Sequence, residues 1–252
     1  MARWASLQLF KTGWYRFWQD SHRLPGKAWR RWAGTLAMGL GVCAILTFAM
    51  TLYVKGNVDQ GIQSWDARML PILAENLPLS FSRAITWESP GNSVGMLPVV
   101  IVFTGIMVAR SQPLLAATMP VAYVLQFALV WIGWGYWNRD RPSLIADGVA
   151  ASGLHSFPSG HTVVVLTVHG LLFFLWWRAT RSWVEKLVIM LLALVWVGLI
   201  VSSRLVLGAH WPTDVIVGVI IGCLWLAVVI VALVRAEAIA QKSPSESYIH
   251  HR

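Results

Sequence analysis

Long apolar stretches of about twenty residues set the strongest limit on how this chain can fold. Of the 252 residues, 57% are hydrophobic and only 12% are charged. A typical soluble domain has about 25% charged residues, roughly twice this share. Inside a bilayer every backbone polar group must be satisfied within the chain, which favours helices. The sequence therefore predicts an all-α polytopic membrane protein.

The apolar runs predict a six-transmembrane-helix bundle within one membrane domain at residues 32–234. The expected spans are residues 32–54, 94–109, 113–133, 160–177, 187–202 and 213–234. Apolar residues recur at helical spacing in residues 55–93, so this segment is expected to be an amphipathic helical loop after the first span. A turn at Pro90-Gly91-Asn92 should precede the second span.

Positive charge is unevenly distributed over the two sides of this bundle. The side that holds both termini carries 14 of the 20 Lys and Arg residues, and the opposite side carries six. Lys and Arg are enriched in cytoplasmic segments. We therefore expect a plasma (inner) membrane protein with both termini in the cytoplasm. The net charge of +9 is explained by this topology, so no nucleic-acid partner is expected.

The ends of the chain differ from the membrane domain in composition. Residues 1–31 are basic and aromatic, which predicts a cytoplasmic helix lying on an anionic membrane surface; a disordered basic tail is the alternative. Residues 235–252 are expected to form a polar cytoplasmic tail. Cys43 and Cys223 both lie within apolar runs and are expected to be free thiols.

Ionisable residues cluster at the non-cytoplasmic ends of the later spans, where they are costly and usually functional. In the last cluster, Pro212 suits a helix start, so His210 precedes the helix and Asp214 lies in its first turn. This spacing can bring the carboxylate beneath the imidazole, fix one ring nitrogen as a donor and leave the other as a nucleophile. Alternatively, Asp214 only interacts with the helix dipole and His210 is an interfacial residue.

A second cluster, Pro158 to His161, also predicts a helix start. Gly160 allows close backbone approach, and free N–H groups beside Ser159 would form an anion site. His161 is placed to give a proton to a departing alkoxide. Arg141 and Arg204 suit the oxygens of a phosphate group. The alternatives are an ordinary turn with a helix cap, and arginines that anchor to lipid headgroups.

These clusters resemble the three signatures of the type 2 phosphatidic-acid phosphatase superfamily, which includes the vanadium haloperoxidases. The matching residues are Arg-Pro at 141–142, Pro-Ser-Gly-His at 158–161 and Ser-Arg-x5-His-x3-Asp at 203–214. The resemblance implies that His210 attacks phosphorus to form a phosphohistidine, that Asp214 orients it and that His161 protonates the leaving group. It also implies that Arg141, Arg204, Ser159 and Gly160 hold the phosphate, without a metal or other cofactor.

One position departs from the first signature. The superfamily has a Lys seven residues before the Arg of Arg-Pro, and this chain has Trp134 there. We expect Arg139 to replace the missing cation at the phosphate. The alternative is that Arg139 pairs with Asp140 and the site lacks one cation. His155 is expected to be a loop residue.

The resemblance implies an integral membrane phosphatase; the position of the clusters at the span ends favours a lipid phosphate as substrate, and the charge distribution predicts action from the non-cytoplasmic face. Phosphatidic acid, phosphatidylglycerophosphate and isoprenyl diphosphates are candidate substrates, and membrane lipids are further expected partners; the sequence does not indicate protein partners. Three alternatives remain at this stage. They are a lipid phosphotransferase that uses the same intermediate, a metal-dependent hydrolase with the His and Asp groups as ligands, and a catalytically weak lipid-binding homologue.

Overall fold

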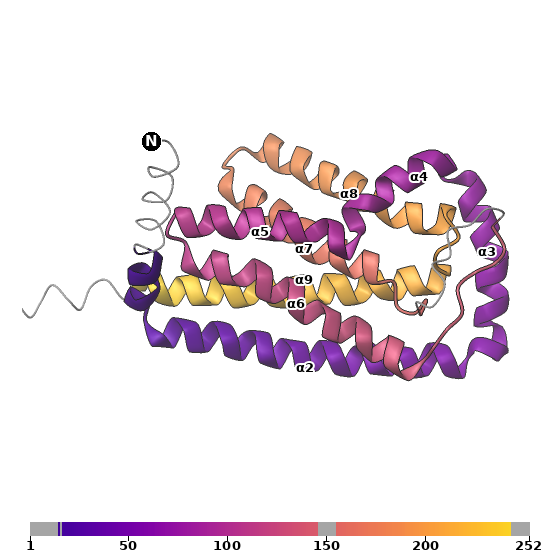
Figure 1. The fold of residues 1–252 in the computed structure, drawn as a ribbon, viewed down its shortest axis with the longest axis horizontal. Helices are drawn as coiled ribbons and strands as arrows, with labels where there is room; N and C mark the ends of the chain where they lie inside the picture. The colour runs from indigo at the N-terminus through magenta and orange to yellow at the C-terminus, as the bar shows by residue number, and fades with distance from the viewer. Residues whose placement is uncertain (1–14, 16, 146–154, 243–252) are drawn as a thin grey trace, which may run out of the picture.

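The structure is a computed structural model that describes residues 15, 17–145 and 155–242. Within these ranges all regular structure is helical, and six long helices lie side by side (Figure 1). They are α2 (Gly26–Gly56), α5 (Ser93–Ala109), α6 (Pro113–Tyr136), α7 (Gly160–Ala179), α8 (Trp183–Val206) and α9 (Pro212–Lys242). The expectation of an all-α polytopic membrane fold is confirmed.

Five of these helices in the described ranges are long and apolar enough to cross a membrane without help. The exception is α5, which has 17 residues. It is preceded by α4 (Phe81–Glu88) and η2 (Ser89–Gly91), and the two parts meet at an angle of 46°. Taken together, this bent pair forms the sixth candidate span. The second candidate span is therefore a bent pair of helices, whose α5 part corresponds to the segment expected at 94–109.

Two helices extend beyond the domain boundaries that hydropathy indicates. The boundary expected at 31/32 falls inside α2, which begins at Gly26, and the boundary at 234/235 falls inside α9, which continues to Lys242. The reason is that apolar composition marks only the part of a helix in the hydrocarbon core. Charged residues with long stems continue the helix into the headgroup region. Most of the basic segment 1–31 precedes α2, and residues 1–14 lie outside the described ranges.

The helical loop after the first span is confirmed. It contains η1 (Val58–Ile62), a short π-helix, then α3 (Gln63–Asn76) and α4. Figure 1 shows α3 and α4 at the end of the bundle where α7 and α9 begin and α8 ends. All three predicted polar clusters also belong to this end, because they lie at or next to these helix termini.

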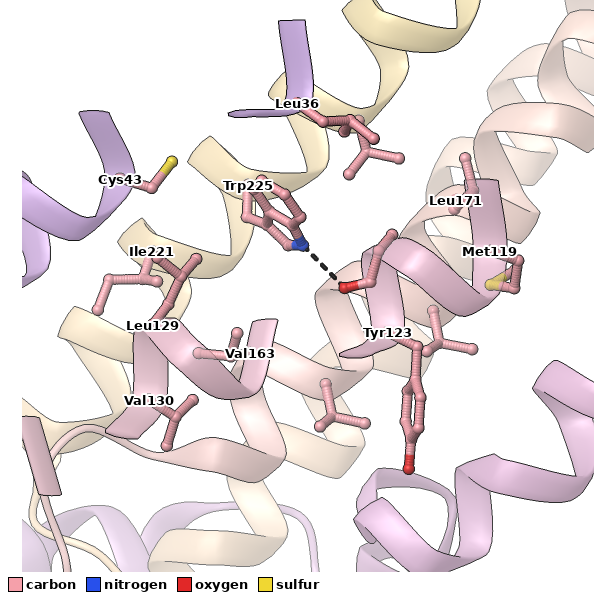
Figure 2. Close-up of a cluster of buried hydrophobic side chains, with 14 of the residues drawn as sticks. Leu36, Cys43, Met119, Tyr123, Leu129, Val130, Val163, Leu171, Ile221 and Trp225 are labelled. Carbon is pink, nitrogen blue, oxygen red and sulfur yellow. Dashed lines mark hydrogen bonds between the residues drawn. The ribbon is translucent and has the colours of Figure 1, made fainter. Parts of the chain in front are cut away.

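The core is built around α9, which packs most extensively on α2 and α7. Trp225 of α9 is fully buried, and its Nε1 donates to the carbonyl oxygen of Ala122 in α6 at 3.1 Å (Figure 2). Leu129, Val163 and Ile221 are buried in the same cluster. Because packing in the bilayer relies on close contact and hydrogen bonds, this core fixes the relative positions of α6, α7 and α9.

The segment that leads into α7 packs directly on the backbone of α6. A Cβ atom at Gly133 would lie 2.9 Å from the carbonyl oxygen of Phe157 and closer still to Cδ of Pro158. Such distances are too short for a side chain without a shift of backbone. Gly133 therefore sets the depth at which the Pro158 segment sits on the bundle.

We expect Gly133→Ala to lower the melting temperature of the purified protein in detergent, because overpacking a tight contact costs about 1–3 kcal/mol. Gly135→Ala is the matched control, since a Cβ at Gly135 meets nothing within 4 Å. In a helix this control should be neutral or stabilising by about 0.5–1 kcal/mol. Equal melting temperatures for the two variants would contradict the tight contact at Gly133.

Candidate active site

A sharp turn after α8 delivers His210 to the start of α9. Gly208 adopts φ +62°, a left-handed conformation that glycine accepts without steric cost. The N–H groups of Gly208 and Ala209 donate to the carbonyls of Leu205 and Arg204, at 2.9 and 3.0 Å. Helix α9 then begins at Pro212, as the sequence predicts.

His210 is buried, with 1% of its surface exposed, and its ring is oriented by a backbone carbonyl. Nδ1 lies 2.8 Å from the carbonyl oxygen of Ser156. Because a carbonyl can only accept, Nδ1 must carry the proton and Nε2 keeps its lone pair. Burial lowers the pKa of His210 to about 4, opposed by Asp214 and assisted by Arg204. The imidazole is therefore neutral at neutral pH.

Asp214 does not hold His210 directly. Its Oδ2 lies 3.7 Å from Nδ1 of His210, too far for a hydrogen bond. The same oxygen accepts from the backbone N–H of Trp211 at 2.8 Å and from the hydroxyl of Ser156 in a short contact. That Asp214 orients the ring therefore stays a prediction, and in this geometry its hydrogen-bonded link to the ring runs through Ser156. Asp214 positions Ser156, and Ser156 positions the ring.

Arg139 was expected to contact the phosphate, but its guanidinium group lies in a buried network of hydrogen bonds and ion pairs within the protein. Its Nη1 donates to Asp214 at 2.6 Å and to Thr213 at 2.7 Å, and its Nη2 donates to Asp66 at 2.6 Å and to Gln63 at 2.9 Å. These four bonds use every hydrogen of both terminal nitrogens. The geometry therefore supports neither a phosphate contact by Arg139 nor its pairing with Asp140.

Asp66 of α3 is the residue of this network that the sequence analysis missed. Its carboxylate is fully buried and accepts from the backbone N–H of Thr213 at 2.9 Å and from its hydroxyl at 2.6 Å. Asp66 lies one helical turn before Leu70, and these two are the buried residues of α3. An acid on the apolar face of an amphipathic helix was the signal available in the sequence.

The start of α7 has the features of an anion site. Ser159 makes no side-chain cap; its Oγ accepts from Thr162 at 3.0 Å and its N–H donates to the carbonyl of Asp214 at 3.1 Å. The helix begins at Gly160. Nε2 of His161 is buried and has no hydrogen-bond partner in the described part of the chain. An uncapped helix start beside an unpaired imidazole suits a negatively charged ligand.

Two guanidinium groups join His161 and His210 in this site. Arg141, Arg204 and His210 are close enough to His161 to act on it electrostatically. Arg141 donates to the carbonyl of Ala209 at 3.0 Å, and its pKa is lowered by burial and then by Arg204. Arg204 is 4% exposed, and its Nε has no hydrogen-bond partner within the described ranges. Two neighbouring cations, Arg204 buried and Arg141 partly buried, favour an anion between them.

Glu88 is a further residue that the sequence did not point to. Its carboxylate forms a short ion pair with Nη1 of Arg204 and comes from the last residue of α4. No motif or spacing in the sequence connects Glu88 with the three polar clusters, because the contact depends on how α4 packs on α8.

Trp134 fills space beside the start of α7. Its Nε1 donates to the carbonyl of Pro158 at 3.2 Å, and a Cβ at Gly160 would lie 3.3 Å from its ring. At the position where the superfamily signature has a Lys, this chain therefore places an aromatic ring against the start of α7. His155 lies with its ring centroid 6.5 Å from that of Trp134 and makes a short contact with Asn138, as a residue of the loop before α7.

Metal ligands are not grouped in the described ranges: no three His, Cys, Asp or Glu side chains there are arranged to hold a metal ion. What the geometry brings together is a buried neutral imidazole, a second imidazole, two guanidiniums and a helix start. Such a set can hold an anionic ligand beside an imidazole nitrogen that keeps its lone pair.

Comparison with known proteins identifies the family. Residues 114–237 match the family model of the PAP2 superfamily. This stretch contains all three signatures, so the resemblance drawn from them is confirmed. Residues 114–237 belong to the PAP2 superfamily.

Two known proteins are similar to this chain. It is 33% identical over 139 residues to YbjG of Escherichia coli (strain K12), whose name proposes an undecaprenyl-diphosphatase. That match covers 52% of this chain and 63% of the relative, so the chain spans less than two thirds of the curated relative's length. The fold is similar to the crystal structure of the first transmembrane PAP2 type phosphatidylglycerolphosphate phosphatase from Bacillus subtilis. The TM-score is 0.63 at 19% identity, covering 82% of this chain and 98% of that chain.

We expect Arg139→Gln to destabilise the protein by about 3–5 kcal/mol, because it leaves Asp66 and Asp214 buried without their cation. Asp66→Asn should also destabilise, but the double variant should lose less than the sum of the two, by at least about 1 kcal/mol. Unfolding in mixed micelles measures these losses. The exposed Arg83→Gln is the control and should melt near the wild-type temperature. If the Arg139→Gln protein had wild-type stability and a raised KM, the result would indicate that Arg139 binds the substrate phosphate and contradict its role in the buried network.

Proposed function

We propose that this protein is an integral membrane phosphatase that hydrolyses a lipid phosphate through a phosphohistidine on His210. The observation that carries the proposal is the convergence of Arg141, Arg204 and the unpaired Nε2 of His161 with a neutral His210 at an uncapped helix start. Membership of residues 114–237 in the PAP2 superfamily supports it.

In the proposed first step, Nε2 of His210 attacks phosphorus while the bond from phosphorus to the lipid oxygen breaks. A protonated His161 gives its proton to that oxygen, so the leaving group departs neutral. Arg141 and Arg204 bind the equatorial oxygens on which transition-state charge gathers. The Ser159 hydroxyl and the N–H of Gly160 complete the phosphate site.

In the second step, water attacks the phosphohistidine and the bond from phosphorus to nitrogen breaks. His161, now neutral, takes a proton from the water, which restores its charge for the next cycle. Orthophosphate is released and His210 regains its lone pair. These steps balance protons and charge with residues of the chain alone, so we propose a reaction that does not depend on a metal.

The proposed substrate is a lipid because the site lies at the ends of the spanning helices, at the level of lipid headgroups. Isoprenyl diphosphate is the first candidate, since the relative with 33% identity is named for undecaprenyl diphosphate. Phosphatidylglycerophosphate and phosphatidic acid are the next ones to test. From the charge distribution we propose cytoplasmic termini and an active site on the non-cytoplasmic face.

Purified protein should release orthophosphate from at least one of these lipids, and His210→Ala should reduce the rate by a factor of about 10³ or more. His22→Ala changes an exposed histidine near the N-terminus and is the matched control. Substrate labelled in its terminal phosphate should leave an acid-labile label on the wild type and none on His210→Ala. A variant that keeps more than about a tenth of the rate would remove His210 as nucleophile.

Other results of the same assay would select a different function. Label that appears on an acceptor lipid instead of in orthophosphate would indicate a phosphotransferase. Activity lost in a chelator and restored by zinc or magnesium would indicate a metal-dependent enzyme. A folded protein that binds lipid phosphates but turns over none of them would be a lipid-binding homologue.

Cysteine labelling tests the proposed orientation. In a Cys43→Ser/Cys223→Ser background, a membrane-impermeant thiol reagent applied to intact cells should modify Glu75→Cys but not Arg181→Cys. Both positions are exposed, at opposite ends of the bundle, so reactivity reports sidedness. Permeabilised cells serve as the control, because both positions should then react. The reverse pattern in intact cells would place the active site in the cytoplasm.

A further inference from the structure

Glu88 is ion-paired with Arg204, one of the two guanidinium groups that would bind the phosphate if the proposed function is right. Its Oε2 is ion-paired with Nη1 of Arg204. The Arg204 side chain is 5% exposed, whereas that of Glu88 is 25% exposed. The carboxylate can therefore turn towards water when a ligand arrives, while the guanidinium has to stay in the site.

The charge balance of the site makes this contact important. Arg139 is neutralised by Asp66 and Asp214, and position 134 has no cation. Under the proposed function, the permanent positive charge that faces the phosphate is then carried by Arg141 and Arg204. Glu88 acts electrostatically on both of these arginines. One carboxylate thus offsets about half of the charge that would hold a phosphate.

The backbone fixes Glu88 at the site. The preceding residue, Trp87, packs its ring edge-on against Trp196 of α8, with centroids 5.4 Å apart. Immediately after Glu88, η2 runs close to the catalytic helix: a Cβ at Gly91 would lie 3.5 Å from Cδ2 of His161. Because the residues on both sides of Glu88 are packed against the bundle, its backbone is fixed in a position from which the side chain contacts Arg204.

The geometry points to Glu88 as an internal competitor for the phosphate site. Its carboxylate occupies Arg204 in the empty site, gives way to the more highly charged lipid phosphate, and returns to Arg204 as orthophosphate leaves. A phosphate monoester carries a charge of about −1.5 to −2, whereas a carboxylate carries −1, so the substrate phosphate binds Arg204 more strongly and displaces Glu88. The competition lowers affinity for the product and speeds its release. This role rests on the proposed function.

The test is direct binding of orthophosphate and orthovanadate to full-length protein in detergent, measured by calorimetry, together with their inhibition constants. Glu88→Gln keeps the shape of the side chain and removes its charge. Both dissociation constants should fall by about tenfold or more, since one charge-assisted competitor is lost. Glu75→Gln, an exposed acid on α3, should leave them unchanged. Glu88→Asp, with a shorter reach, should give intermediate values and replaces the Gln variant if that protein does not fold.

The outcomes separate this role from the proposed function. If the wild type binds vanadate and releases phosphate from lipid, but Glu88→Gln binds the anions equally or more weakly, then Glu88 only positions Arg204 and the competitor role is overturned. If neither protein binds either anion or releases phosphate, the proposed function itself fails. Tighter anion binding in Glu88→Gln, with Glu75→Gln unchanged, establishes the competitor.

Discussion

The buried bridge from Asp66 through Arg139 to Asp214 is the interaction on which the rest of the site depends. It joins α3, the segment after α6 and the first turn of α9, which are far apart in the sequence. A buried ion costs several kcal/mol unless it is paired and hydrogen-bonded. The bridge meets this condition, because Arg139 sits between the Trp137 and Trp211 rings and donates to two carboxylates. The helical loop after α2 therefore belongs to the end of the bundle that holds the candidate site.

From this bridge a chain of contacts leads to the proposed nucleophile. Asp214 accepts from the Ser156 hydroxyl, and the Ser156 carbonyl fixes Nδ1 of His210. A carbonyl orients the ring without adding the full charge of an adjacent carboxylate. In keeping with this, the pKa of His210 is lowered to about 4, chiefly by burial. A weakly basic imidazole is a poorer nucleophile, but it is also a better leaving group from phosphorus in the second proposed step.

Sequence analysis could find the spans and the three clusters because both are local properties. Apolar composition over about twenty residues marks a span, and the spacing from His210 to Asp214 lies within one helical turn. The partners of Arg139 could not be found in this way, since Asp66 reaches it only after α3 folds over the start of α9. The same is true of Glu88, whose position depends on the bend between α4 and α5. The exact helix ends could not be predicted either, because hydropathy marks only the part of a helix that lies in the hydrocarbon core.

Three arginines and three carboxylates lie at this end of the bundle, and their ion pairs give the arginines different roles. They are Arg139, Arg141, Arg204, Asp66, Asp214 and Glu88. Arg139 is ion-paired with two carboxylates, whereas Arg204 is ion-paired with Glu88, and Arg141 is acted on electrostatically by both Asp214 and Glu88. With Trp134 in place of a cation and His210 uncharged, the empty site is held together without a large excess of positive charge. A site of this kind stays folded before its ligand arrives. In the role proposed for Glu88, the charge brought by a phosphate displaces the pair between Glu88 and Arg204, whose carboxylate is more exposed than those of Asp66 and Asp214.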